Sequence, residues 1–158
     1  MTWNQTNPIP TVIVNRHPRK DLSLISLRRK ISKIFELLDL GRASVDLTLA
    51  SDAVVRRQNR LHRNIDKTTD VLSFPQFDPN EDLSFYKNQF LGDILISLDR
   101  ASVQARQQKI SFEDEVLFLT LHSILHLLGF DHATKEEEEV MQAKESEIWI
   151  QLRRRAKR

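Results

Sequence analysis

Hydrophobic residues recur along this chain with two different periods, and these periods predict both helices and strands. A spacing of three or four residues, as between Leu27, Ile31 and Ile34, is typical of one buried helix face. Alternation with a period of two, as in Val45 and Leu47, is typical of a half-buried strand. The patterns predict strands at 11–14, 45–50, 71–74 and 94–98, and helices at 24–38, 51–61, 99–108, 111–128 and 134–152.

Residues that favour helix starts support these boundaries. Ser51 or Asp52, Ser111 and Thr134 precede helical segments, and their side-chain oxygens accept hydrogen bonds from first-turn amides when they act as N-caps. Segment 77–89 shows neither period, so we expect a loop there. The resulting order, β-α-β-α-β-β-α-α-α, predicts an α+β fold in which a mixed sheet of about four strands is packed by about five helices.

Composition restricts the class of protein. The chain has 158 residues, the size of one domain with one core, so we expect a single domain over residues 1–158. The absence of cysteine excludes disulfides and thiolate metal ligands, which leaves His, Asp and Glu to hold any metal. No apolar run reaches the roughly 18 residues of a membrane-spanning helix, and the first ten residues do not resemble a signal peptide. We therefore expect a cytoplasmic protein without a membrane partner.

The distribution of charge leaves two interpretations open. The formal net charge is only +2, which is too small to demonstrate a nucleic-acid partner. Basic clusters that converge on one face would follow a phosphate backbone, whereas the ordinary interpretation is solvated helix faces and a frayed end. The basic residues cluster at Arg16, Arg19 and Lys20, at Arg28, Arg29, Lys30 and Lys33, at Arg56, Arg57, Arg60 and Arg63, and in an expected basic tail over 153–158.

Three histidines near the C-terminal half of the chain have the spacing of metal ligands. His122 and His126 are four residues apart, which places both imidazoles on one helix face, one turn apart. Gly129 can adopt the left-handed conformation that ends a helix, so the chain can turn back and bring His132 to the same ion. Three His ligands leave a fourth position for water, and that open position is typical of catalytic zinc. The motif therefore predicts a hydrolase with one Zn²⁺ per chain.

The three-histidine motif has two other interpretations, as ordinary histidines and as a peptidase site. A lone His is usually an ordinary core or surface residue, but burying three unpaired imidazoles among apolar residues would cost several kcal/mol. The spacing His122, His126, His132 also matches metzincin peptidases, whose motif carries a Glu general base directly after the first His. Ser123 occupies that position here, and a hydroxyl cannot replace a carboxylate as a base. The motif thus favours a metal-dependent hydrolase of something other than peptides.

Three segments carry a resemblance to a known family. The segment His122–His132, with sequence HSILHLLGFDH, is similar to the signature of the bacterial rRNA maturation factor YbeY, a zinc-dependent endoribonuclease family. Arg63–Pro75, which ends in TDVLSFP, looks like the family's central block, and Leu91–Ser97 looks like its next strand. The resemblance covers residues 45–135 closely and the remainder by the order of elements.

The resemblance also implies a catalytic role for Arg63, as a residue that lines the active cleft. A guanidinium can grip a phosphate bidentately and stabilise its developing charge. The ordinary alternative is a surface ion pair with Asp66 or Asp70. Two departures from the family pattern, Ser123 in place of Gly and Thr68 in place of Pro, lie away from the metal-ligand positions.

The activity implied by the resemblance is that of a zinc-dependent, single-strand-specific endoribonuclease in rRNA processing, notably at the small-subunit 3′ end, and in ribosome quality control. The implied partners are single-stranded and ribosomal RNA and the small ribosomal subunit with its proteins, and no DNA partner is expected. A metzincin-like zinc peptidase and a non-catalytic ribosome-assembly factor remain alternatives. Asp70 and Asp93 stay unassigned between orienting a ligand His and capping local structure, and Asp131, beside His132, is placed to orient the loop. None of the three is assigned as a general base.

Overall fold

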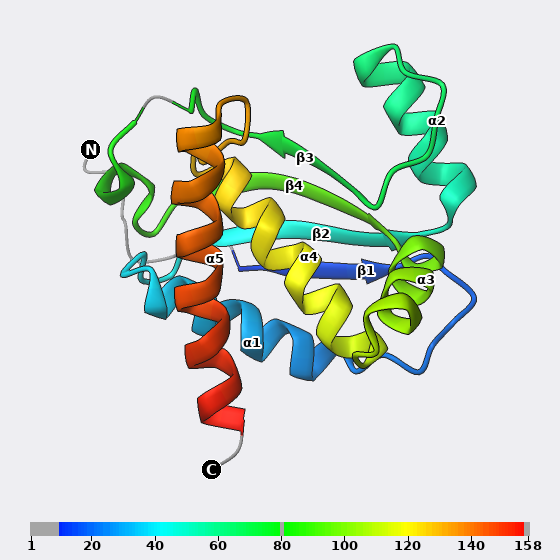
Figure 1. Cartoon of the computed structure of the whole chain (residues 1–158), viewed down its shortest axis with the longest axis horizontal. Coiled ribbons are helices and arrows are strands. Elements are labelled where there is room, and N and C mark those ends of the chain that lie inside the picture. The colour runs from blue at the N-terminus through cyan, green and yellow to red at the C-terminus, as the bar shows by residue number, and fades with distance from the viewer. Residues whose placement is uncertain (1–9, 80, 157–158) are drawn as a thin grey trace, which may run out of the picture.

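The fold is described from a computed structural model of the chain, which describes residues 10–79 and 81–156. Its centre is a four-stranded sheet with strand order β1-β2-β4-β3 (Figure 1). β1, β2 and β4 are parallel and β3 is antiparallel to β4, so the sheet is mixed, as predicted, and β1 and β3 form its edges. The strands are β1 (Val12–Asn15), β2 (Ser44–Ala50), β3 (Val71–Pro75) and β4 (Phe90–Ser97).

Five α-helices pack around this sheet within the described part of the chain, which confirms the predicted α+β fold. They are α1 (Leu24–Leu37), α2 (Asp52–Arg63), α3 (Leu98–Gln108), α4 (Phe112–Leu127) and α5 (Lys135–Ala156). The expected loop 77–89 contains a short 3-10 helix, η1 (Leu83–Tyr86), and its residue 80 lies outside the described residues. β4 begins four residues earlier than predicted, because Gly92 and Asp93 interrupt the apolar alternation without ending the strand.

Serine side chains fix where the helices begin. Ser51 and Ser111 accept hydrogen bonds from the backbone amides three residues later, as the sequence predicted, and Ser23 and Ser97 do the same for α1 and α3. Thr134 likewise accepts a hydrogen bond from the third following amide, at 3.2 Å. Each cap satisfies one of the orphan amides of a first helical turn.

The core lies mainly on one face of the sheet. Helix α4 packs against β3 and β4 on that face, and apolar residues of α1, α3 and α5 complete the same cluster. A second, smaller cluster on the opposite face joins α2 to the sheet through Val55, Leu72 and Leu95. Ile94 and Ile96 face the large cluster while Leu95 faces the small one, so β4 is buried on both faces, as its sequence predicted.

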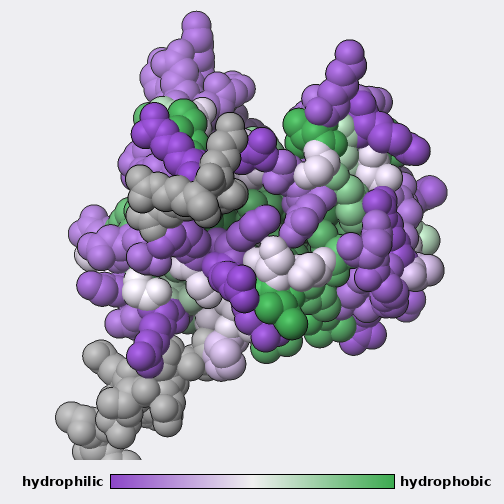
Figure 2. Space-filling view, turned by 90° about the horizontal axis from the view of Figure 1, so that it is seen from below, coloured by the Kyte–Doolittle hydropathy of each residue, from purple (hydrophilic) through white to green (hydrophobic). Residues whose placement is uncertain are grey.

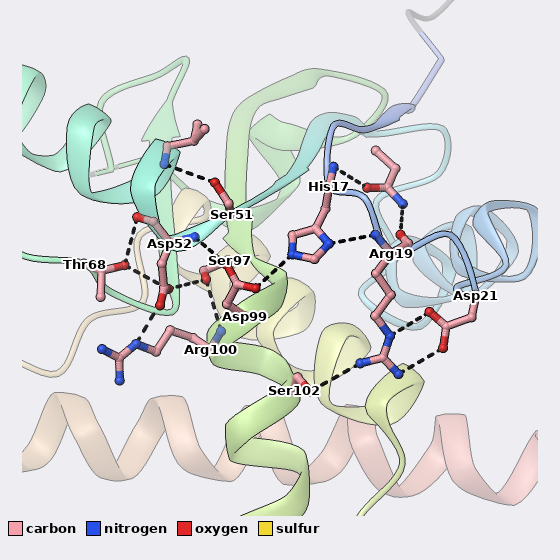
Figure 3. A network of polar contacts seen from close by, with 12 residues as sticks. His17, Arg19, Asp21, Ser51, Asp52, Thr68, Ser97, Asp99, Arg100 and Ser102 are labelled. Atoms are coloured by element: carbon pink, nitrogen blue, oxygen red, sulfur yellow. Dashed lines mark hydrogen bonds and ion pairs between the residues drawn. The ribbon is translucent and has the colours of Figure 1, made fainter.

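A polar network at the carboxyl ends of the parallel strands holds α2 in place (Figure 3). Asp99 accepts hydrogen bonds from the His17 ring at 2.9 Å and from the Asp52 backbone amide at 2.8 Å. These bonds, led by the backbone amide, lower the pKa of Asp99. The Asp52 carboxylate in turn accepts from the hydroxyls of Ser97, at 2.6 Å, and Thr68, at 3.1 Å. The network therefore joins the first turn of α2 to the segment that leads into β3.

The C-terminal helix is longer than the sequence suggested. Its predicted end near Leu152 was wrong, because α5 continues to Ala156. Leu152 is buried against the core, and Arg153 forms an ion pair with Asp114 of α4, so the chain is held beyond the expected boundary. Most of the expected basic tail is thus helical, and Lys157 and Arg158 lie outside the described residues.

The exterior is largely polar. The face seen from below in Figure 2 is mostly hydrophilic with a limited hydrophobic area, and the exposed large apolar side chains are spread over several elements. Such scattered exposure is ordinary for a protein surface. Among the helices described, none combines the length and the apolar character needed to cross a membrane.

Candidate metal centre

The end of α4 is shaped to return the chain toward the helix. Gly129 donates to the His126 carbonyl and Phe130 donates to the Leu125 carbonyl, each at 3.0 Å. This pair of bonds is a Schellman motif, which requires a left-handed residue after the cap, and Gly129 has φ of 96°. A side chain at position 129 would also collide with the Pro79 carbonyl oxygen. The predicted left-handed glycine is therefore confirmed, with close backbone packing as a second reason for it.

The loop that follows carries the third histidine. Asp131 accepts a hydrogen bond from the backbone amide of His132 at 2.8 Å. This local bond orients the loop, which is the role that the sequence suggested for Asp131. His132 is exposed, whereas His122 and His126 are half-buried on α4.

The three imidazoles converge, as the spacing predicted. One ligand nitrogen from each of His122, His126 and His132 lies within 4.8 Å of the others, and the two Nε2 atoms on α4 are 3.1 Å apart. Tetrahedral zinc with Zn–N bonds of about 2.0–2.1 Å separates its ligand nitrogens by about 3.3 Å. The donor set and its spacing therefore fit a single metal ion.

A carboxylate on α5 completes the environment of His122. Glu145 is buried, and its Oε1 contacts Nδ1 of His122. Because Nδ1 donates its proton to this carboxylate, the lone pair of Nε2 points toward the other two imidazoles. A carboxylate behind a ligand His fixes its tautomer and raises its basicity.

The sequence analysis missed Glu145, although a signal was present. Met141, Glu145, Ile148 and Leu152 recur at helical spacing, and all four are buried. A carboxylate within an otherwise apolar stripe is unusual, because burying a charge without a partner is costly. That position therefore indicated a polar partner on the facing element, but it did not say which one.

Burial favours the neutral form of His126. Desolvation lowers the pKa of His126, and the neighbouring imidazoles of His122 and His132 lower it further, whereas Asp131 and the backbone of Phe130 act weakly in the opposite direction. A neutral imidazole offers the lone pair that a metal needs.

The three histidines line an open groove of about 960 Å³ that also contains Arg63. Arg63, at the end of α2, donates from Nη2 to the Ser73 carbonyl of β3 at 2.9 Å. Asp66, its expected partner under the ion-pair alternative, is instead paired with Arg56 at 2.9 Å. Among the described residues no carboxylate lies within ion-pair distance of Arg63, so its charge is available to the groove.

Two carboxyl groups, those of Asp70 and Glu115, lie near each other. Asp70 lines the groove and accepts a hydrogen bond from Gln104 at 3.4 Å. Glu115 is buried, and no described residue bonds to its Oε2. Burial raises the pKa of Glu115, and the nearby Asp70 raises it further. Asp93 is on the sheet beside Asp46 and is not among the described residues that line the groove.

The basic clusters do not gather on one face. α1 and α2 lie on opposite sides of the molecule (Figure 1), and basic residues outside α2 form local pairs such as Arg19 with Asp21 and Lys30 with Glu113. Of the described basic residues, Arg63 alone lines the groove. The α2 cluster is therefore the one placed to act with the metal site.

Comparison with known proteins agrees with this geometry. The family model for endoribonuclease YbeY matches residues 13–153, which is most of the chain. The chain belongs to the endoribonuclease YbeY family. Membership makes this YbeY-family protein a metal-dependent hydrolase, with the three converging histidines as its candidate metal ligands.

Individual relatives match over most of their length. Endoribonuclease YbeY of Thermoanaerobacter sp. (strain X514) is 37% identical over 154 residues, covering 89% of this chain and 96% of the relative. Endoribonuclease YbeY of Symbiobacterium thermophilum is 43% identical over 127 residues, covering 77% and 81%. The solution structure of TM1509 from Thermotoga maritima matches with a TM-score of 0.58 at 27% identity, over 93% of both chains.

We predict that Glu145→Gln weakens metal binding about tenfold or more, because the neutral amide no longer orients and polarises His122. Competition against a chelator measures the affinity. Glu147→Gln is the matched control, since Glu147 lies on the same helix but is exposed and paired with Lys144. Equal affinity in the two variants would contradict the role given to Glu145.

A second prediction concerns pH and Glu115. Because the folded-state pKa of Glu115 is raised, its contribution to stability is fully present below the unfolded pKa of about 4.3 and is lost as pH rises through the folded pKa. Glu115→Gln removes this titration, so the Tm of the variant relative to wild type should be higher at pH 8 than at pH 5. If the difference in Tm between Glu115→Gln and wild type were the same at pH 5 and pH 8, the pKa of Glu115 would not be raised by folding.

Proposed function

We propose that this protein is a zinc-dependent, single-strand-specific endoribonuclease that acts in rRNA processing, notably at the small-subunit 3′ end, and in ribosome quality control. The observation that carries the proposal is that Arg63 and the three histidines line one groove. A groove with a metal site and an unpaired guanidinium suits a phosphodiester substrate. The ribosomal context comes from the family resemblance, and it names ribosomal RNA and small-subunit proteins as partners.

The three imidazoles have complementary roles in this proposal. His122, His126 and His132 would hold the ion, and three protein ligands would leave a coordination position for water. Bound zinc would lower the pKa of a water molecule toward about 7 and polarise a phosphoryl oxygen. Glu145 keeps His122 in the tautomer that presents Nε2 to the ion.

Arg63 binds and orients the scissile phosphate. One of its N–H groups is used by the Ser73 carbonyl, and this bond holds the guanidinium against β3. Its remaining donors are free to contact two phosphoryl oxygens, where they stabilise charge that develops during cleavage. The nearby ring of Phe74, 5.9 Å from the guanidinium carbon, limits its freedom further.

The charges along the groove favour a single-stranded substrate. Arg63 lines the groove, and so do Glu136 and Glu137 from the first turn of α5. A duplex presents phosphates on two backbones, and its second backbone would meet these carboxylates. One strand can contact Arg63 without that repulsion.

A peptidase is less well supported by the same geometry. Ser123 stands where metzincins carry their general base, and it is fully buried in α4 rather than placed at the groove. Its hydroxyl has no hydrogen-bond partner within the described residues and does not face the reacting groups. A non-catalytic assembly factor would not need an open metal position beside an unpaired arginine.

Arg63→Ala separates catalysis from metal binding. We predict that zinc content and Tm stay close to wild type while cleavage of single-stranded RNA falls about 10²–10³-fold, the usual loss for one electrostatic donor. Arg63→Lys should recover only part of the rate, because an ammonium cannot make a bidentate fork. His126→Ala should lose both metal and activity.

These measurements are made on the same preparations, with cleaved RNA and a peptide substrate assayed side by side. Full activity in Arg63→Ala would place the phosphate contact elsewhere. Cleavage that survives both His126→Ala and a chelator would contradict the metal-dependent mechanism. Peptide products without RNA products would overturn the proposed substrate.

RNA affinity should depend on α2 rather than on overall charge. Arg60 lies one turn before Arg63 and is exposed, so Arg60→Ala should weaken binding and reduce the slope of log affinity against log salt by about 1. Arg29→Ala on α1, which removes the same charge far from the groove, is the matched control. Equal effects of the two substitutions would show that binding follows net charge alone.

A further inference from the structure

The outer strand β3 presents one hydrogen-bonding edge to its neighbour and the other to the groove. The Asp70 carbonyl accepts from Ser97 and the Gln76 amide donates to Leu91, each at 2.9 Å. Hydrogen-bonded positions alternate in an antiparallel pair, so even-numbered residues from 70 to 76 point their backbone groups at β4. The backbone groups of residues 71, 73 and 75 therefore point away from the sheet.

This outward edge lies inside the groove that holds the metal ligands. Val71, Ser73 and Pro75 all line it, together with Arg63. The bond from Arg63 to the Ser73 carbonyl confirms the direction of the edge, because a carbonyl directed at β4 would not be reached from α2. A substrate in the groove therefore passes along exposed backbone of β3.

The outward-facing backbone groups of β3 differ in whether they are free to bind a ligand. The amides of Val71 and Ser73 have no hydrogen-bond partner in the part of the chain that the structure describes. The Ser73 carbonyl is already occupied by Arg63, and Pro75 has no amide to offer. The outward edge thus offers two amide donors beside a cation, while its acceptors are reduced to the carbonyls of Val71 and Pro75 because Arg63 occupies that of Ser73.

This imbalance disfavours an extended peptide as the occupant. A peptide that adds to a sheet edge needs alternating donors and acceptors along the strand. Arg63 removes the acceptor at Ser73, and Pro75 removes the next donor, so such a ladder would stop after one residue. A ligand that contacts the edge through acceptors alone can use the two amides and needs neither the occupied Ser73 carbonyl nor the amide that Pro75 lacks.

We propose that the backbone amides of Val71 and Ser73 hold phosphate oxygens of the RNA strand beside the one gripped by Arg63. The proposal rests on the RNA substrate proposed above and extends it to named backbone groups. Amides two residues apart on one strand edge are separated by about 6.6–6.8 Å, so they can contact separate oxygens along an extended chain. Contacts to phosphates position a strand without reading its bases, which predicts binding with little sequence preference.

The hydrogen bond between Arg63 and the Ser73 carbonyl fixes the guanidinium relative to the β3 amides. It joins the guanidinium to the same residue whose amide faces the groove, so both donors keep a fixed relation to each other. Hydrogen bonds from amides to an ionised acceptor are stronger than neutral ones, and the groove supplies the neighbouring positive charge. Phosphates adjacent to the cleaved bond would therefore be held by β3 itself.

The test removes the backbone N–H of Ser73, whose side chain has no part in the proposal. Ser73→Pro deletes the outward amide, and an edge position of this kind tolerates proline, as Pro75 two residues later demonstrates. Ser73→Ala is the reference, because it lacks the hydroxyl but keeps the amide. Both are assayed for zinc content, Tm, RNA affinity and cleavage of a single-stranded oligonucleotide, and Ser73→Pro should bind and cleave about 10–100-fold less well than Ser73→Ala.

A substrate-side arm identifies the contacted group. A methylphosphonate next to the scissile linkage removes one phosphate charge, so it should weaken cleavage by wild type but cause little further loss in Ser73→Pro. If proline prevents folding, a backbone ester at position 73, introduced as the α-hydroxy acid analogue, removes the same amide without restricting φ.

The outcomes separate this inference from the proposed function. Two results would overturn the role of the β3 edge without affecting the proposed RNA cleavage by wild type. One is equal binding and cleavage by Ser73→Pro and Ser73→Ala. The other is a methylphosphonate that reduces cleavage by Ser73→Pro as much as it reduces cleavage by wild type. RNA binding that depends on the Ser73 amide in a protein that does not cleave would support the edge and overturn the endonuclease. Absence of RNA binding by wild type would overturn both.

Discussion

Three imidazoles can bind one ion only when their nitrogens converge, and much of this structure serves that requirement. His122 and His126 share a helix face, but His132 arrives only because α4 ends in a left-handed glycine and the chain reverses. Gly129 is also packed against the Pro79 carbonyl, so the turn depends on the loop before η1 as well. The convergence therefore couples a helix end to a distant loop.

The buried carboxylate of Glu145 links this requirement to the packing of the whole domain. α5 contributes Met141, Ile148 and Leu152 to the core and places Glu145 against His122 from the same face. A buried carboxylate without a partner would be destabilising, and an imidazole without an orienting acceptor would lose its preferred tautomer. Each group thus stabilises the other, and docking α5 on α4 assembles the site as it completes the core.

The groove has a different character on each side because different elements form it. β3 contributes an open strand edge, α2 contributes Arg63, and the start of α5 contributes acidic side chains. α2 packs on the opposite face of the sheet from α4, and the polar network around Asp52 and Asp99 keeps it there (Figure 3). The three histidines and Arg63 therefore come from elements on opposite faces of the sheet, and they line one groove beside its edge strand β3.

Local sequence patterns predicted most of the elements and the convergence of the three histidines. Periodicity and serine caps are local properties, and the i, i+4 spacing with a following glycine is enough to predict two ligands and the return of a third. The two boundary errors have different causes. The predicted β4 was too short because Gly92 and Asp93 break its apolar alternation, which is a local effect. The predicted α5 was too short because the contact that holds its last turn comes from α4.

The tertiary structure alone decided which distant groups meet. Nothing within α2 indicates that Arg63 reaches β3 rather than Asp66, because that choice depends on Arg56 occupying Asp66 and on the packing of α2. Glu145 stood out as a carboxylate in an apolar stripe, yet its partner depends on how α5 crosses α4. The direction of the β3 edge depends on its pairing register with β4. The sequence determined which chemical groups the protein has, whereas the packing of elements far apart in the chain decided which of them face one another.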